Sequence, residues 1–198
     1  MTTVAESEVE GPWDYGDFTV VCSRASWPDL LSTLWPMYEE SFGPLRVLAA
    51  ARHVLTEQEF ADELEDPRIW KYIALDRQGR PAGLATLADD MSALPWISAA
   101  YYAHHYPEEA SRNAVYYNGL TLVRPDMRRH PVFARLVACV GRRVAATRGV
   151  VAFDICGFND DGRSLGKVTG QLLNKVAEFD LQTVDVQTYY VARATGKQ

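Results

Sequence analysis

The segment from residue 114 to residue 156 limits most strongly how this chain can fold. Residues 114–123, AVYYNGLTLV, are rich in the β-branched and aromatic residues of a strand, and VVAFDIC at 150–156 has the same character. Between them, residues 131–149 carry apolar side chains at helical spacing, and Pro131 suits a first helical turn. A strand, a helix and a second strand in this succession predict an α/β sheet covered by helices.

The rest of the chain fits the same architecture. The other expected elements are a strand at 17–25, helices at 28–42 and 56–65, a β-hairpin at 70–89, a loop at 157–163, a helix at 164–177 and a final strand or hairpin at 183–194. Residues 90–113 are a long aromatic segment with a short helix near 98–105, and such segments usually line or cover a site. The sequence predicts a single-domain α/β fold with a mixed central sheet flanked by helices on both faces.

Composition indicates where the folded domain begins. Residues 1–17 hold five acidic residues and no basic one, which indicates a flexible acidic N-terminal segment before a domain at 18–198. That segment lacks the basic and apolar regions of a secretory signal. No apolar run reaches the roughly 18 residues of a membrane helix. We therefore expect a cytoplasmic protein with no membrane partner.

Charge and cysteine content exclude several other classes. The net charge of −6 argues against general nucleic-acid binding. Three cysteines, Cys22, Cys139 and Cys156, form neither an even set for disulfides nor a metal-ligand spacing. We expect reduced thiols and no metal.

Basic residues gather in one stretch despite the negative net charge. Residues 124–148 hold seven arginines against the single acid Asp126: Arg124, Arg128, Arg129, Arg135, Arg142, Arg143 and Arg148. Two interpretations stand side by side, a solvated helix face and a phosphate-binding corner.

One motif in this region resembles a known family. Residues 116–136, YYNGLTLVRPDMRRHPVFARL, resemble the strand, loop and helix of the GNAT superfamily of CoA-dependent N-acyltransferases, in which V-x-P is followed by x-x-R/Q-x-x-G-x-G/A. Val123, Pro125 and Arg128 fall in that register, and the order of elements agrees from about residue 18 to residue 194. The resemblance implies a GNAT-like sheet with acetyl-CoA or a longer acyl-CoA as co-substrate. It also implies that the ends of strands 114–123 and 150–156 splay to admit the thioester arm.

The phosphate loop departs from the family pattern. Counted from Arg128 the glycine positions hold Pro131 and Phe133, and counted from Arg129 they hold Val132 and Ala134. Proline has no N–H to donate, so the arginines would supply charge that the glycines do not. The resemblance implies the following cofactor contacts: Leu120, Leu122, Val123, Arg128, Arg129, His130, Val132, Phe133, Ala134 and Asn159. The role of Arg124 would be the same as that of Arg128 and Arg129.

A second departure concerns the acid that protonates the leaving thiolate. The family often places a tyrosine on the helix that follows Asn159, yet residues 160–178 contain none. We expect Tyr117 and Asp154 to be the catalytic residues, with Asp154 as the base because it lies in an apolar strand. Each has a structural alternative, Tyr117 as a wall of the core and Asp154 as a hydrogen-bond acceptor. Backbone N–H groups at about 120–123 would polarise the thioester carbonyl.

Other reactive side chains have plainer explanations. Cys156 is either a nucleophile or a small buried apolar residue, and no histidine lies near it in sequence. His104 and His105 are either a base on a mobile loop or solvated loop residues. Asp89 and Asp90 close a strand, where they would hold an amine or cap the strand end. We expect four residues to face the acceptor substrate: Asp90, Trp96, Tyr101 and Asn118.

These features together predict the reaction. The expected activity is transfer of an acyl group from a thioester donor, acyl-CoA or acyl carrier protein, to an amine of a small molecule. The altered glycine loop and the aromatic segment 90–106 resemble the N-acyl amino acid and acyl-homoserine-lactone synthase branches, and residues 124–148 would suit an acidic carrier protein. The alternative is a catalytically inactive GNAT-fold binding protein.

Overall fold

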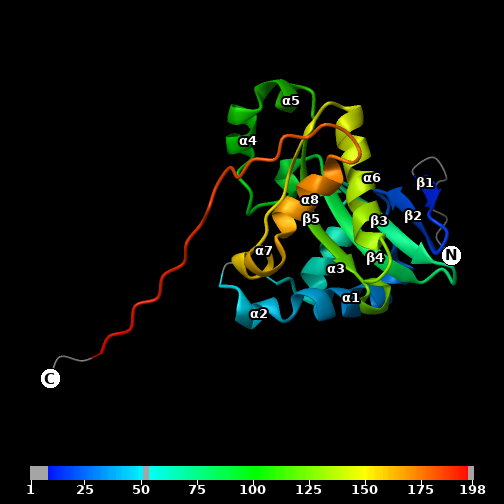
Figure 1. Cartoon of the computed structure of the whole chain (residues 1–198), viewed down its shortest axis with the longest axis horizontal. Helices are drawn as coiled ribbons and strands as arrows, with labels where there is room; N and C mark the ends of the chain where they lie inside the picture. The colour runs from blue at the N-terminus through cyan, green and yellow to red at the C-terminus, as the bar shows by residue number, and fades with distance from the viewer. Residues whose placement is uncertain (1–8, 51–53, 196–198) are drawn as a thin grey trace.

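The computed structural model describes residues 9–50 and 54–195, and six of its strands form one sheet in the order β1-β2-β3-β4-β5-β6 (Figure 1). The strands are β1 (Val9–Asp14), β2 (Phe18–Ser23), β3 (Ile69–Asp76), β4 (Pro81–Ala88), β5 (Val115–Val123) and β6 (Val150–Ala152). Neighbours from β1 to β5 are antiparallel, and β6 runs parallel to β5. The expected mixed sheet is confirmed.

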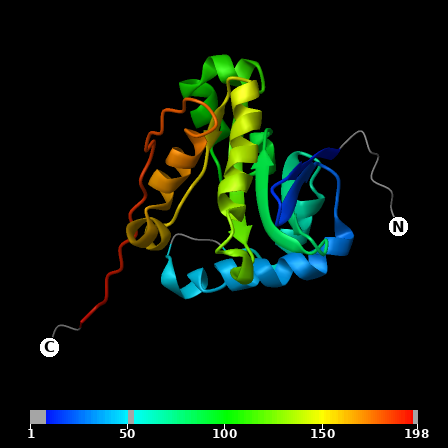
Figure 2. The same cartoon turned by 45° about the vertical axis from the view of Figure 1, so that its right-hand side comes forward.

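Helices cover both faces of the sheet. The longer ones are α1 (Pro28–Phe42), α3 (Glu57–Glu65), α6 (Val132–Ala146) and α8 (Leu165–Leu173), and the shorter ones are α2 (Leu45–Leu48), α4 (Ala99–His105), α5 (Pro107–Ser111) and α7 (Gly157–Arg163). Two single 3₁₀ turns, η2 (Met91–Ala93) and η3 (Pro125–Met127), complete the described elements. Figure 2 shows α6 lying along the sheet with α8 beside it, and α1 passing below. The expectation of helices on both faces is confirmed.

Two apolar clusters hold these layers together. Under α6, Leu136, Val140 and Val144 pack on side chains from one face of the sheet, including Val20 and Tyr72. On the other face α1 and α3 contribute Tyr38 and Phe60, among others, to a second cluster. Because side chains alternate along a strand, the inner strands supply both clusters at once, and all eight residues of β4 are buried.

Local signals account for several boundaries. Thr56 and Glu59 form the expected capping box, in which each side chain accepts from the backbone N–H of the other. Pro28 occupies the first turn of α1. Gly79, with φ of 76°, turns the β3–β4 hairpin. The starts of α1 and α3 and the turn between β3 and β4 therefore lie where the sequence predicts them.

The first strand differs from expectation. Residues 9–14 belong to the segment expected to be flexible, yet they pair with β2 as strand β1, while residues 1–8 lie outside the described part. The cause is contact with α6. Arg142 stacks over the ring of Trp13, and Arg143 forms an ion pair with Glu10 at 2.6 Å. An acidic composition therefore did not indicate disorder here.

The C-terminal part also differs from expectation. Residues 157–163, expected to be a loop, form α7, and the next helix ends at Leu173 rather than at 177. The N–H groups of Asn159 and Asp160 donate to the carbonyl of Cys156, which closes the first turn of α7. The expected strand or hairpin at 183–194 is wrong for this structure, because residues 174–195 contain no helix and no strand.

Candidate active site

The strands β5 and β6 separate soon after they begin. They pair only at Val115 with Val150, Tyr116 with Val151 and Tyr117 with Ala152. Beyond Tyr117, β5 continues to Val123 while β6 has ended, although residues 150–156 were expected to be one strand. The expected splay is confirmed. It leaves backbone groups of β5 on this side without a neighbouring strand.

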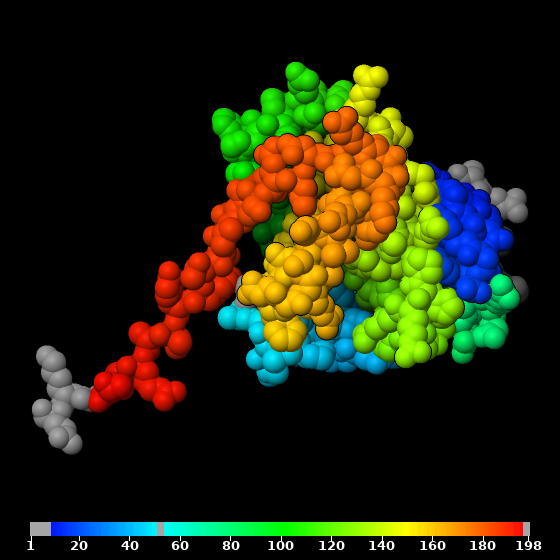
Figure 3. Space-filling view, viewed as in Figure 1, coloured from blue at the N-terminus to red at the C-terminus, as the bar shows by residue number. Residues whose placement is uncertain are grey.

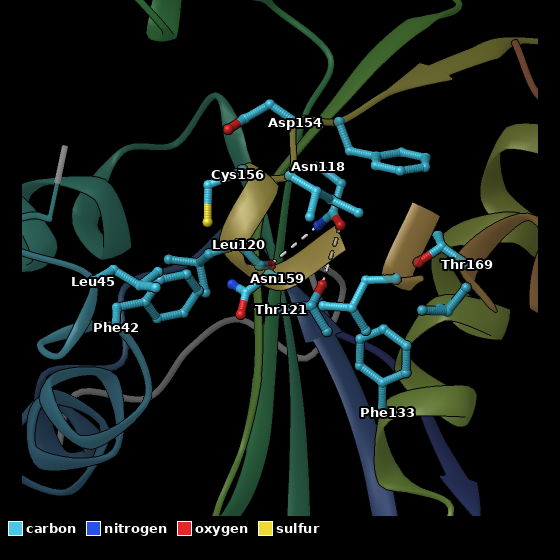
Figure 4. Close-up of a pocket in the computed structure, with 15 residues that line it drawn as sticks. Phe42, Leu45, Asn118, Leu120, Thr121, Phe133, Asp154, Cys156, Asn159 and Thr169 are labelled. Carbon is cyan, nitrogen blue, oxygen red and sulfur yellow. Dashed lines mark hydrogen bonds between the residues drawn. The ribbon is translucent and has the colours of Figure 1, made fainter. Parts of the chain in front are cut away.

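A bulge in β5 lies beside the splay. The β4–β5 register shifts between Ala85 and Leu87, so that Thr86 lies opposite both Gly119 and Leu120. The side-chain amide of Asn118 donates to the carbonyls of Thr86 (2.6 Å) and Leu120 (3.1 Å). Its oxygen accepts from the hydroxyl of Thr121 at 3.1 Å, as the dashed lines of Figure 4 show. Asn118 thus fixes the shape of the bulge.

A small cavity fills the opening between the two strands. Its volume is about 120 Å³, and its walls include Phe42, Leu45, Leu120, Phe133, Cys156 and Thr169. Figure 4 shows Phe42 and Leu45 on one side and Phe133 and Thr169 on the other. Elements from both faces of the sheet therefore meet here, and most of the wall is apolar.

Tyr117 and Asp154, expected to be catalytic, are in direct contact. The Tyr117 hydroxyl donates to Asp154 Oδ1 at 2.5 Å, across 37 positions of sequence. Tyr117 is buried, whereas Asp154 is exposed and lines the cavity. The expectation of a carboxylate inside an apolar strand was wrong, because β6 ends at Ala152 and Asp154 lies in the loop beyond it.

The backbone donors of the bulge are only partly available. The N–H of Leu120 donates to the Thr86 hydroxyl oxygen at 3.2 Å, and that hydroxyl donates to Glu63 Oε1 at 2.8 Å. The Leu120 N–H therefore points toward α3, away from the opening between β5 and β6. It is not available to polarise a thioester carbonyl, as was expected of the N–H groups at 120–123. A Cβ on Gly119 would lie 3.0 Å from Thr86 Oγ1 and 3.3 Å from Glu63 Oε1, so a larger residue here would require these two side chains to shift.

Thr86, Gly119 and Glu63 were not identified from the sequence. The one available signal was a glycine inside a strand, which often marks a bulge or a close backbone approach. Glu63 lies on α3, 23 positions from Thr86, and no local pattern connects the two.

The expected phosphate corner lies at the start of α6. The helix begins at Val132 with Pro131 before it, and the first N–H groups of a helix have no partner within it. Arg128 and Arg129 are exposed in the turn before it, and neither forms an ion pair with the described residues. These features together form a site suited to an anion.

Arg124 does not belong to this corner. Its guanidinium forms ion pairs with Asp76 at 2.9 Å and Asp126 at 2.6 Å and donates to the carbonyl of Pro81. The expectation that it supplies charge for phosphate was wrong, because two carboxylates neutralise it. Burial opposes ionisation of Asp76, but the hydrogen bonds from Arg124 and Arg80 still lower its pKa to about 2.

The remaining arginines do not form one basic face. Arg135 lies over the ring of Tyr15, Arg142 donates to the Tyr15 hydroxyl, and Arg143 donates to the Tyr72 hydroxyl. These three residues point toward the sheet and its N-terminal strands. The seven-residue spacing of Arg135 and Arg142 places them on one side of α6, whereas Arg128 and Arg129 precede the helix, so neither sequence interpretation describes the whole stretch.

The other expected cofactor residues divide between core and surface. Leu122 and Val132 are buried in the two clusters, and Val123 packs at the edge of the core. Phe133 and Asn159 line the cavity, from α6 and α7. The nearby residue Ala134 is half-buried in the first turn of α6, and His130 Nδ1 lies 3.2 Å from a carboxylate oxygen of Asp17.

Of the four expected acceptor contacts, only Asn118 lines the cavity. Asp90 caps η2, where its side chain accepts from the N–H of Ser92 at 2.8 Å. Trp96 is 57% exposed, and the Tyr101 hydroxyl donates to the carbonyl of Val184 at 3.4 Å.

The alternative candidates are also placed by the structure. Asp89 forms an ion pair with Arg24. His104 and His105 lie in the exposed last turn of α4. Cys156 lines the cavity and packs on the α1 cluster, and no histidine lines the same cavity.

Comparison with known proteins identifies the fold. No family model and no curated protein matches the chain. Among solved structures, an aminoglycoside acetyltransferase, meta-AAC0020 from an uncultured soil metagenomic sample in complex with trehalose, is 11% identical with a TM-score of 0.52, over 90% of this chain and 99% of that one. Aminoglycoside N-acetyltransferase AAC(6')-Iy in complex with CoA is 14% identical with a TM-score of 0.50, over 89% and 95%.

A further structure, a probable acetyltransferase, is 16% identical with a TM-score of 0.50, over 88% of this chain and 99% of that one. Within the described residues we find no helix able to cross a membrane and no cluster of three potential metal ligands. The six-stranded mixed sheet with helices on both faces matches the fold of these acetyltransferase structures. The chain therefore has the GNAT fold.

Proposed function

We propose that this protein transfers a short acyl group from acyl-CoA to an amine of a small molecule. The observation that supports this most is the cavity between β5 and β6, which opens where the two strands stop pairing. A thioester arm needs unpaired backbone groups on one side and apolar walls on the other. Both are present at this point.

The start of α6 supports CoA as the donor. The N–H groups of its first turn and the exposed Arg128 and Arg129 would bind the pyrophosphate, and Phe133 leads from there into the cavity. A carrier protein is less well supported, because Arg135, Arg142 and Arg143 are engaged with aromatic rings and hydroxyls of the protein itself.

The size of the cavity favours a short acyl chain. Its volume of about 120 Å³ is somewhat below the roughly 150 Å³ of a cavity that binds benzene. A space of this size suits an acetyl or propionyl group better than a long chain. Phe42, Leu45 and Leu120 would enclose its methyl end.

The chemistry uses groups at the mouth of this cavity. The amine nitrogen attacks the thioester carbonyl, its proton passes to the Asp154 carboxylate directly or through water, and the C–S bond breaks to release thiolate. Tyr117, bonded to Asp154, holds that carboxylate in place. Since a thiol has a pKa near 8.5, the thiolate leaves without a dedicated acid at little cost. Most of the rate would come from positioning, with about 10²–10⁴-fold from proton transfer.

Ligand stabilisation tests the donor. The unfolding temperature should be measured with CoA, acetyl-CoA and a long-chain acyl-CoA. A ligand at 100 times its Kd adds about 2.7 kcal/mol to the free energy of unfolding. We expect stabilisation by CoA and acetyl-CoA. Absence of any shift with all three would contradict the proposal and favour an inactive binding protein.

Turnover tests the reaction. Release of free thiol from acetyl-CoA should be followed with a panel of small amines, beginning with aminoglycosides because two of the similar structures are aminoglycoside acetyltransferases. We expect amine-dependent release with at least one member. Stabilisation by acetyl-CoA without release in the presence of any amine would oppose catalysis while leaving the binding site intact.

A further inference from the structure

Three aromatic side chains form a row along one face of α1. Trp35, Tyr38 and Phe42 follow one another at spacings of three and four residues, which places them on the same side of the helix. The ring centroids of Trp35 and Tyr38 lie 5.6 Å apart and those of Tyr38 and Phe42 lie 4.9 Å apart, and both pairs are stacked. Phe42 is the last residue of α1, so its ring ends the row.

The middle of this aromatic row is held firmly by the surrounding protein. Tyr38 is fully buried, and its hydroxyl oxygen accepts from the N–H of Leu55 at 2.9 Å. The ring of Phe60, on α3, lies 4.8 Å from the ring of Tyr38 and 5.8 Å from that of Trp35. Packed rings lose their mutual contacts when one of them turns away. The Phe42 ring therefore has a fixed neighbour in Tyr38, and it can swing aside only by giving up this stacking.

Phe42 reaches the cavity between β5 and β6. It lines the cavity on the side opposite Phe133 (Figure 4). Leu45 and Leu120, each 4% exposed, line the cavity with it. Phe133 belongs to the first turns of α6, where the pyrophosphate of CoA would bind. A thioester arm that enters beside Phe133 would thus direct its acyl chain toward Phe42.

The protein beyond Phe42 is filled. Phe42 packs against the buried cluster of α1 and α3, which includes Tyr38 and Phe60. Figure 3 shows α2 and α7 side by side at the surface, and they contribute Leu45 and Asn159 to the cavity wall. An acyl chain longer than the cavity would have to displace packed side chains, and the first that it meets is Phe42.

We propose that Phe42 limits the length of the transferred acyl group, because its ring closes the end of the cavity that faces away from α6. This role rests on the proposed acyl transfer and assigns the choice of donor to one side chain. Replacing the ring by a methyl group would join the space that it occupies to the cavity of about 120 Å³. The wild type would prefer acetyl and propionyl donors, and the variant Phe42→Ala would also accept butanoyl and hexanoyl donors.

Binding of a donor series tests this role while the acceptor amine is unknown. The Kd values of CoA, acetyl-CoA, butanoyl-CoA and hexanoyl-CoA should be measured by calorimetry for the wild type and Phe42→Ala. The affinity for hexanoyl-CoA relative to acetyl-CoA should rise about 100-fold in the variant, because each newly buried methylene contributes roughly fourfold. The Kd of CoA in each protein corrects this ratio for any general weakening of binding.

Two further variants make the test specific. Phe42→Leu removes less of the core than Phe42→Ala, so it keeps the test valid if the alanine variant fails to fold, and it should improve relative binding of butanoyl-CoA more than that of hexanoyl-CoA. The matched control, Phe133→Ala, removes a ring from the opposite wall of the same cavity. It should weaken all four ligands by a similar factor and leave the preference for short chains in place.

The outcomes separate this role from the reaction itself. An unchanged affinity ratio in the folded Phe42 variants, with acetyl-CoA still bound, would overturn the role of Phe42 and leave the proposed acyl transfer intact. An equal rise of the ratio in Phe133→Ala would also overturn it, because any enlargement of the cavity would then have the same effect. Absence of binding of all four ligands to the wild type would contradict the acyl transfer, and the role of Phe42 with it.

Discussion

The Tyr117 hydroxyl donates to Asp154 at 2.5 Å, next to the point where β5 and β6 stop pairing. Tyr117 comes from the last paired position of β5, and Asp154 follows the end of β6 by two residues. The separation of the strands therefore brings a buried phenol and an exposed carboxylate to the mouth of the cavity.

This pair predicts unequal effects of two substitutions. Asp154→Asn removes the proton acceptor and should lower kcat about 10²-fold, whereas Tyr117→Phe removes only its orienting hydrogen bond and should cost about 10-fold. Because the two residues act together, the double variant should be no worse than Asp154→Asn alone. The measurement is acetyl transfer to the best amine. A stable and fully active Asp154→Asn protein would leave this carboxylate with a structural role only.

The start of α6 predicts a salt-dependent loss of CoA affinity. Replacing Arg128 and Arg129 together by Ala should weaken CoA binding roughly 30-fold, at about 1 kcal/mol for each exposed charged contact. The loss should shrink as ionic strength rises. The matched control, Arg68→Ala with Arg112→Ala, removes the same charge near the opposite end of β5 and should leave the Kd unchanged. Equal Kd values for the two double variants would place the pyrophosphate elsewhere.

The hydrogen bonds of Thr86 predict an effect on stability that needs no substrate. Thr86→Val keeps the shape of the side chain but removes its hydrogen bonds with the buried Leu120 N–H and with Glu63. Leaving a buried N–H unsatisfied costs about 1–3 kcal/mol, which denaturant unfolding would measure. Thr86→Ser keeps the hydroxyl and should restore most of that loss. If the Val variant is as stable as the wild type, the bulge does not depend on this hydroxyl.

Buried Lys71 predicts how stability changes at alkaline pH. Its side chain is fully buried and donates to the carbonyls of Arg24 (2.5 Å) and Asp66 (3.0 Å). Burial lowers its pKa from 10.5 to about 8. Between these values the unfolded chain binds more protons than the folded one, so the free energy of unfolding should rise with pH, by at most about 3 kcal/mol.

The variant Lys71→Met isolates this contribution, because its free energy of unfolding should lack the increase that begins near pH 8 in the wild type. Burial also raises the pKa of Cys22 from 9.0 to about 12, which lowers stability as pH increases over that range in both proteins. The difference between wild type and variant cancels this opposing effect. Identical slopes for the two proteins between pH 8 and pH 9 would contradict a neutralised Lys71.

Local patterns in the sequence were sufficient for much of the fold. The strand at β5, the apolar face of α6, the capping box of α3 and the β3–β4 hairpin each depend on residues close together in the chain. Their order, with the V-x-P motif, was sufficient to predict a GNAT-like sheet and its splay. Such features are readable because helix and strand periodicity is a property of a short segment.

Long-range contacts decided the rest. Arg124 is neutralised by Asp76, 48 positions away, and Tyr117 meets Asp154 across 37 positions, so neither relationship appears in any local pattern. β1 forms from an acidic segment because two arginines of α6 contact Trp13 and Glu10. Residues 183–191 have the composition of a strand, but a strand also needs a partner, and their backbone pairs with no other strand in the described residues. Sequence alone sets what each segment can form, and tertiary contacts decide which partners it meets.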